Sequence, residues 1–148
     1  MDAIPVYQVI ANDGTKAPFA TQQTPGRWSS GTLHAIYVSC QASTALLEFL
    51  AHLESSLPDT LACSRMRLRP GQIEVLDSLP ENWKERPYRE DVQRVGDAWL
   101  ASRRSLALRV PCALSPASYN LILNPAHPDH AASKADFTEV FRLDRRLM

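Results

Sequence analysis

The chain has 148 residues, enough for one domain with a substantial hydrophobic core, and 45% of them are hydrophobic, as in ordinary globular proteins. Its 16 basic residues balance its 16 acidic residues, so no bulk positive field attracts nucleic acid. No stretch approaches the roughly 20 apolar residues that a membrane helix requires. The composition therefore disfavours direct nucleic-acid binding and membrane insertion, and it leaves enzymes and binding modules as the classes to weigh.

The three cysteines, Cys40, Cys63 and Cys112, are odd in number and far apart. They predict neither a disulfide framework nor a zinc site, and we expect no bound metal. The first ten residues carry no long apolar core, so they do not resemble a signal peptide. A reducing cytoplasm is the expected location.

The first elements in chain order are two strands separated by a long loop. Residues 6–10 are typical of a short strand, and residues 12–30 are rich in Gly, Pro, Thr, Gln and Ser, which predicts a loop. A loop of this length is often a lid or a binding segment. Residues 33–38 then predict a second strand, in which Ala35 and Tyr37 share one face.

A helix is predicted next, from leucines that repeat at helical spacing: Leu46, Leu50, Leu53 and Leu57. Ser39 or Ser43 can cap its start, and Pro58 ends it. Glu48 lies off the apolar stripe of this helix. It is therefore either a solvated residue, as most helical glutamates are, or a carboxylate that points into a cleft beside the end of the Tyr37 strand.

The rest of the chain contains more strands than helices. A helix is predicted at residues 91–104, and strands at residues 60–68, 73–76, 105–110, 120–123 and 139–143. Because the strands do not alternate regularly with helices, the pattern favours a mixed α+β fold over a doubly wound nucleotide-binding sheet. The five glycines form no Gly-x-Gly-x-x-Gly fingerprint, which agrees with this prediction.

Several polar residues have chemistry that suits a nucleotide, although each has a commoner role. Arg27 can grip a phosphate through two hydrogen bonds, or it can pack on Trp28 at the surface. Tyr37 can stack on a flat ring, but a tyrosine in a strand is more often part of the core. Cys112 follows a proline at a strand end and can be a nucleophile, whereas an inert buried thiol is the commoner case. Taken singly, none of these residues establishes a site.

The order and spacing of these residues nevertheless resemble the RES domain family, which is named for an Arg, a Glu and a Ser. The matching residues are Gly26, Arg27, Trp28, Gly31, Tyr37, Glu48, Gly96, Trp99, Leu100, Val110, Pro111, Cys112, Ala113, Asn120, Asn124, Pro125, His127, Pro128, Phe141, Asp144, Arg146 and Leu147. No single tripeptide in this series is specific, but the ordered series covers nearly the whole chain. The resemblance therefore assigns residues 1–148 to one RES domain.

The resemblance implies an ADP-ribosyltransferase-like fold, in which a split mixed β-sheet with flanking helices clamps NAD. Members of the family are mostly toxins of bacterial toxin–antitoxin pairs that break the bond between nicotinamide and ribose. The ADP-ribose passes to water, inorganic phosphate or a target protein. NAD would thus be a substrate, with no permanently bound cofactor. The implied partner is an antitoxin with an Xre-like helix-turn-helix region, and a homodimer is also compatible.

The resemblance gives the matching residues their roles. Arg27 would bind the NAD phosphates, Tyr37 would stack on nicotinamide, and Glu48 would stabilise the positively charged ribose. Asn120 or Asn124 would contact the base or the ribose, and the sequence leaves the choice between them open.

The chain departs from the family pattern at three places. Cys112 stands where the family has its Ser, and a thiol is a weaker hydrogen-bond donor and acceptor than a hydroxyl. Residues 19–25 lack the glycines that are usual in that loop, and Gln8 follows Tyr7 where relatives often have Arg. These departures keep one alternative open, a RES-fold binding module with weak or no catalysis. A further alternative is a protein-directed ADP-ribosyltransferase, which shares the site and differs only in the acceptor.

Overall fold

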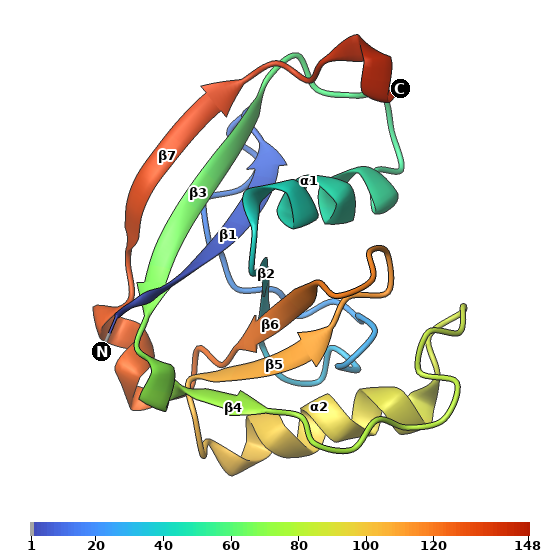
Figure 1. Ribbon diagram of the computed structural model, residues 1–148, viewed down its shortest axis with the longest axis vertical. Helices are drawn as coiled ribbons and strands as arrows, with labels where there is room; N and C mark the ends of the chain where they lie inside the picture. Colours follow the sequence, from blue (N-terminus) through green and yellow to red (C-terminus); the bar gives the residue numbers. More distant parts are fainter. Residues whose placement is uncertain (1) are drawn as a thin grey trace.

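The computed structural model describes residues 2–148 as one mixed sheet with two α-helices (Figure 1). The strands are β1 (Ile4–Ala11), β2 (Ile36–Ser39), β3 (Leu61–Leu68), β4 (Ile73–Val75), β5 (Ala107–Pro111), β6 (Tyr119–Leu123) and β7 (Ala135–Phe141), and the helices are α1 (Ala42–Ala51) and α2 (Glu90–Ser102). The strand order is β4-β5-β6-β2-β1-β3-β7, and in the described residues only β4 and β5 run parallel. The predicted α+β class is confirmed.

The sheet is nearly divided in two between β1 and β2. β1 pairs with β3 along all eight of its residues, but its register with β2 rests on the single pair of Tyr7 and Ser39. Figure 1 shows the consequence: β1, β3 and β7 curve away from β2, β6, β5 and β4, and α1 lies beside the opening. The side chain of Gln8 also spans the gap, because its Nε2 donates to the main-chain oxygen of Tyr37 at 3.2 Å. The opening leaves room for a pocket between the two halves.

α2 covers the face of the sheet on which Tyr37 lies. Trp99 and Leu100 of this helix are buried against β5 and β6, and Tyr37 packs on the same cluster. Burial of each large apolar side chain contributes about 1.5–3 kcal/mol, so this contact fixes the helix on the sheet. The alternate residues of β2, Ile36 and Val38, belong to a separate buried cluster, as expected for a strand covered on both faces.

α1 begins and ends at different residues from those predicted. Gln41 is its N-cap, in place of Ser39 or Ser43, and the helix ends at Ala51 rather than at Pro58. The prediction of the cap was wrong because Ser39 ends β2, where its hydroxyl is engaged by the neighbouring strand.

The leucine repeat reflects partial burial of the leucines themselves more than the length of the helix. Leu46 and Leu50 pack on a core cluster from α1, and Leu57 joins the same cluster from the loop after the helix. The ends of several strands also differ from prediction, most clearly at two: β2 starts at Ile36 rather than at residue 33, and β7 starts at Ala135 rather than at residue 139, because its pairing with β3 extends that far. Across the described part of the chain, no helix has the length and apolar character needed to span a membrane.

Candidate functional site

A pocket of about 300 Å³ lies where the sheet opens. Its wall includes side chains from β1, β2 and α1, together with the loop that precedes β2 and the loop that precedes α2. Four residues proposed from the sequence line it: Arg27, Tyr37, Glu48 and Asn120. This size is at the lower end of small-molecule sites in proteins. The split of the sheet thus brings together residues that lie far apart in the chain.

Glu48 is the carboxylate of this pocket, and a chain of side chains fixes its orientation. Its Oε1 accepts a hydrogen bond from Asn120 Nδ2 at 2.9 Å. The Oδ1 of Asn120 in turn accepts from Ser39 Oγ at 2.8 Å. On the other side, Glu48 Oε2 lies 3.8 Å from His52 Nδ1. The side chain lines the pocket and is 25% exposed, so the carboxylate is held through Oε1 and remains partly exposed.

Cys112 is a neighbour of this carboxylate rather than part of the pocket wall. It is 5% exposed, and its Sγ donates to Glu48 Oε1 at 3.4 Å. Burial raises the pKa of the Cys112 thiol above its ordinary value, so the thiol stays protonated at neutral pH. A protonated, buried thiol is a poor nucleophile. The structure therefore gives Cys112 the position of a weak hydrogen-bond donor to Glu48.

Tyr37 is held by its hydroxyl against the loop that carries Arg27. The main-chain N–H of Trp28 donates to Tyr37 Oη at 3.2 Å, and Ser29 Oγ lies 2.7 Å from the same oxygen. Burial raises the pKa of Tyr37 to about 12, so the ring is neutral. A Cβ at Gly26 would lie 2.8 Å from Tyr37 Oη, which explains why this loop position needs glycine. The phenol thus fixes the loop directly after Arg27 and packs closely against Gly26 before it.

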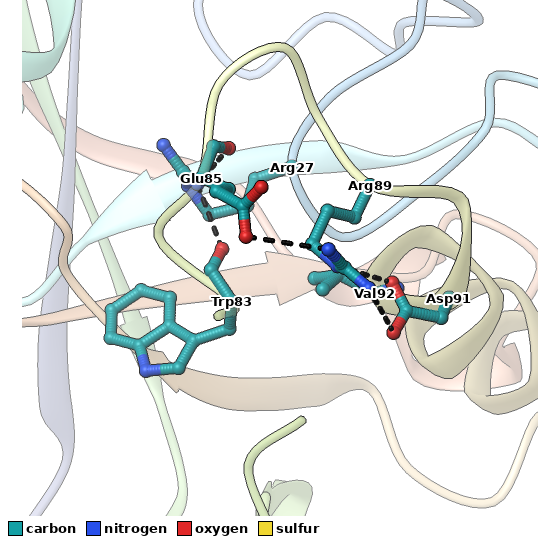
Figure 2. A network of polar contacts seen from close by, with 6 residues as sticks. All are labelled: Arg27, Trp83, Glu85, Arg89, Asp91 and Val92. Carbon is teal, nitrogen blue, oxygen red and sulfur yellow. Dashed lines mark hydrogen bonds and ion pairs between the residues drawn. The ribbon is translucent and has the colours of Figure 1, made fainter. Parts of the chain in front are cut away.

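Arg27 is anchored by the loop between β4 and α2 (Figure 2). Its Nη1 donates to the main-chain oxygens of Trp83 at 2.8 Å and Glu85 at 3.2 Å. The carboxylate of Glu85 pairs with Arg89 Nη1 at 3.3 Å, and Arg89 Nε pairs with Asp91 at 2.9 Å at the start of α2. Within residues 2–148, neither Nε nor Nη2 of Arg27 has a hydrogen-bond partner. These donors are therefore available to a ligand.

The two asparagines that the sequence could not separate lie in different places. Asn120 lines the pocket. Asn124 is buried outside it, where its Nδ2 donates to Leu100 O at 2.9 Å and its Oδ1 accepts from Ala126 N at 3.0 Å. Both ends of its amide are thus occupied in fixing the turn after β6.

Several pocket residues were not found from the sequence, among them Lys16, His52, Arg86 and Tyr88. His52 Nε2 lies 3.0 Å from Tyr88 Oη, which joins the end of α1 to the loop before α2. That loop has no periodic pattern, so nothing in the sequence indicated which of its residues return to the pocket. No group of three or more His, Cys, Asp or Glu residues in the described part of the chain could hold a metal ion.

Comparison with known proteins shows which protein family this sequence matches. Residues 5–145 match the sequence model of the RES domain. A protein named Toxin Res from Yersinia enterocolitica is 37% identical over 111 residues, which cover 69% of this chain and 69% of that protein. The Prs ADP-ribosylating toxin from Sphingobium sp. is 29% identical over 137 residues, which cover 84% of this chain and 81% of that toxin.

A solved structure shares the fold. A chain in the crystal structure of the M. tuberculosis MbcT–MbcA toxin–antitoxin complex superimposes with a TM-score of 0.72 at 14% sequence identity. The match covers 98% of this chain and 86% of that one. At this level of identity, the likeness establishes the shared architecture.

Proposed function

Because the chain belongs to the RES domain family, we propose that it is an enzyme that cleaves NAD between nicotinamide and ribose. The observation that carries the proposal is Glu48, a carboxylate fixed by Asn120 in a pocket that also holds Arg27 and Tyr37. The name of the Sphingobium relative, an ADP-ribosylating toxin, is in keeping with NAD as the substrate.

The chemistry of this cleavage suits the residues of the pocket. As the bond between the nicotinamide nitrogen and ribose C1′ breaks, its electron pair leaves with nicotinamide and C1′ becomes positively charged. Glu48 would stabilise that charge, and the free donors of Arg27 would hold a phosphate. The neutral ring of Tyr37 offers a surface for nicotinamide. An acceptor (water, inorganic phosphate or a protein side chain) then bonds to C1′ and gives up its proton.

Nicotinamide release from NAD by the purified chain tests the proposal. We expect release by the parent chain and a loss of at least about hundredfold in Glu48→Gln, which keeps the size and removes the charge. Glu54→Gln is the matched control, because Glu54 is exposed beyond the end of α1 and does not line the pocket. The mass of the ADP-ribose product, with and without phosphate, identifies the acceptor. A folded parent chain that releases no nicotinamide under any of these conditions would favour the binding-module alternative.

We also propose that the chain acts in the bacterial cytoplasm as the toxin of a toxin–antitoxin pair, restrained by an antitoxin with an Xre-like helix-turn-helix region. The names of the relatives and the likeness to a chain of a toxin–antitoxin complex support this role. Expression of the chain alone should then arrest a bacterial host. Glu48→Gln should relieve the arrest and Glu54→Gln should not; equal toxicity of the parent and Glu48→Gln would contradict the assigned site.

A further inference from the structure

The loop between β4 and α2 brings a second arginine to the pocket. Arg86 and Tyr88 both line the pocket wall. The guanidinium carbon of Arg86 lies 4.8 Å from the centre of the Tyr88 ring, and Arg86 Nη1 donates to Tyr88 Oη at 3.4 Å. The guanidinium carbon of Arg27 lies 5.2 Å from the centre of the same ring. Two guanidinium groups therefore gather around one tyrosine.

Tyr88 is itself fixed from the opposite wall. Its hydroxyl lies 3.0 Å from His52 Nε2, and His52 follows the last residue of α1, the helix that carries Glu48. Arg27 in turn holds the same loop through the main-chain oxygens of Trp83 and Glu85. The position of Arg86 at the pocket is thus set by contacts on both sides of its loop.

The charge of the pocket wall is strongly unbalanced. Three cationic side chains line it, from Lys16, Arg27 and Arg86, against the single carboxylate of Glu48. Within residues 2–148, none of the three cations forms an ion pair. Elsewhere in the chain such pairs are common, as for Arg104 with Glu74 at 2.8 Å. In a chain with no net charge, this local excess indicates an anionic ligand.

We propose that Arg86 is a second phosphate-binding residue, which acts with Arg27 on the diphosphate of a dinucleotide. The inference rests on the proposed function, because it takes NAD as the substrate. Guanidinium groups bind phosphate oxygens through paired, charge-assisted hydrogen bonds, and Tyr88 holds both groups on one side of the pocket. Glu48 then faces the nicotinamide end, where positive charge develops, while the two arginines face the diphosphate.

The experiment compares Arg86→Ala with Lys84→Ala. Lys84 is a matched control in the same loop: it is exposed, its ammonium lies 5.5 Å from the centre of the Trp83 ring, and it does not line the pocket. Calorimetry with ADP-ribose, which keeps the diphosphate and lacks nicotinamide, measures binding, and nicotinamide release measures turnover. For Arg86→Ala we expect about tenfold weaker ADP-ribose binding and about tenfold higher KM for NAD, with kcat within about twofold, as for a lost hydrogen bond to a charged group. Lys84→Ala should match the parent.

A conservative variant separates phosphate binding from a purely structural role. Arg86→Lys keeps the positive charge and should recover part of the lost affinity, whereas Arg86→Gln keeps a polar side chain without the charge and should not. These two variants carry the test if Arg86→Ala fails to fold. Equal ADP-ribose affinities of Arg86→Gln, Arg86→Lys and the parent would overturn the inference, as would a fall in kcat with unchanged KM. A parent chain that neither binds ADP-ribose nor releases nicotinamide would instead refute the proposed function itself.

Discussion

Replacement of Asn120 by alanine tests whether the orientation of Glu48 matters for turnover. Asn120 Nδ2 donates to Glu48 Oε1 at 2.9 Å, and Ser39 Oγ donates to Asn120 Oδ1 at 2.8 Å. Alanine at position 120 removes both bonds at once. Glu48 Oε1 would keep only the thiol of Cys112, a weaker donor at 3.4 Å, and Glu48 Oε2 would keep His52 Nδ1 at 3.8 Å.

The geometry sets the size of the expected effect. A hydrogen bond to a charged group contributes about 1.5–3 kcal/mol, and each 1.36 kcal/mol of transition-state energy corresponds to about tenfold in rate. If the bond from Asn120 holds Glu48 where positive charge develops, kcat should fall by about tenfold to hundredfold. The lost bond to Ser39 should lower the free energy of unfolding by only about 1 kcal/mol.

The assay is nicotinamide release at saturating NAD, together with urea unfolding of each variant. Asn124→Ala is the matched control, because Asn124 is an equally polar residue whose amide binds Leu100 O outside the pocket. That control should lose about 1–3 kcal/mol of stability, since it leaves a buried carbonyl unpaired, and should keep its kcat while folded. The reasoning is refuted if Asn120→Ala keeps kcat within about twofold of the parent, or if folded Asn124→Ala loses as much.

Two further predictions concern stability. Burial raises the pKa of Tyr37 from 10.0 to about 12, so the folded chain holds the phenol proton more tightly than the unfolded chain. Below about pH 10 the phenol is neutral in both states and its burial contributes fully to the free energy of unfolding. This contribution should be lost as the pH rises toward 12. Urea unfolding across this range should show a steeper decline for the parent than for Tyr37→Phe, and parallel declines would contradict the assignment. A Cβ at Gly96 would lie 1.6 Å from Trp28 O, so Gly96→Ala should lower the free energy of unfolding by at least about 2 kcal/mol. Gly71→Ala, with nothing within 4 Å of the added atom, should stay within about 0.5 kcal/mol of the parent in the same urea experiment.

Residue patterns predicted the elements of the fold better than their ends. The alternation at Ile36 and Tyr37 is observed, because a strand between two buried clusters must place successive side chains on opposite faces. The length of α1 was overestimated because Leu57 has helical spacing but reaches the core from a loop. The spacing of apolar residues indicates which side chains pack on the core. It does not by itself determine whether the backbone at those residues is a helix or a loop.

Some residues of the candidate site could be predicted from sequence patterns, and others could not. Arg27 and Glu48 follow from an ordered motif, and they line one pocket. Asn120 and Asn124 were not separable, since both belong to the motif and the motif does not say which of them reaches the pocket; Asn120 lies in β6 and lines the pocket, whereas Asn124 follows the end of β6 at Leu123. Arg86 had no signal at all, because its place depends on contacts made by a loop without regular structure.

The thiol at position 112 bears on whether the chain is an enzyme or only a binding module. Its contact with Glu48 is long, and a thiol is a weak donor, so the exchange of a hydroxyl for a thiol weakens one of two hydrogen bonds to Oε1. The other bond, from Asn120, is shorter and is supported by the buried hydroxyl of Ser39. Because both bonds end on the same carboxylate oxygen and an amide N–H is a stronger donor than a thiol, the orientation of Glu48 depends mainly on Asn120. This dependence is the physical reason to expect that the chain keeps its catalysis with Cys112 in place.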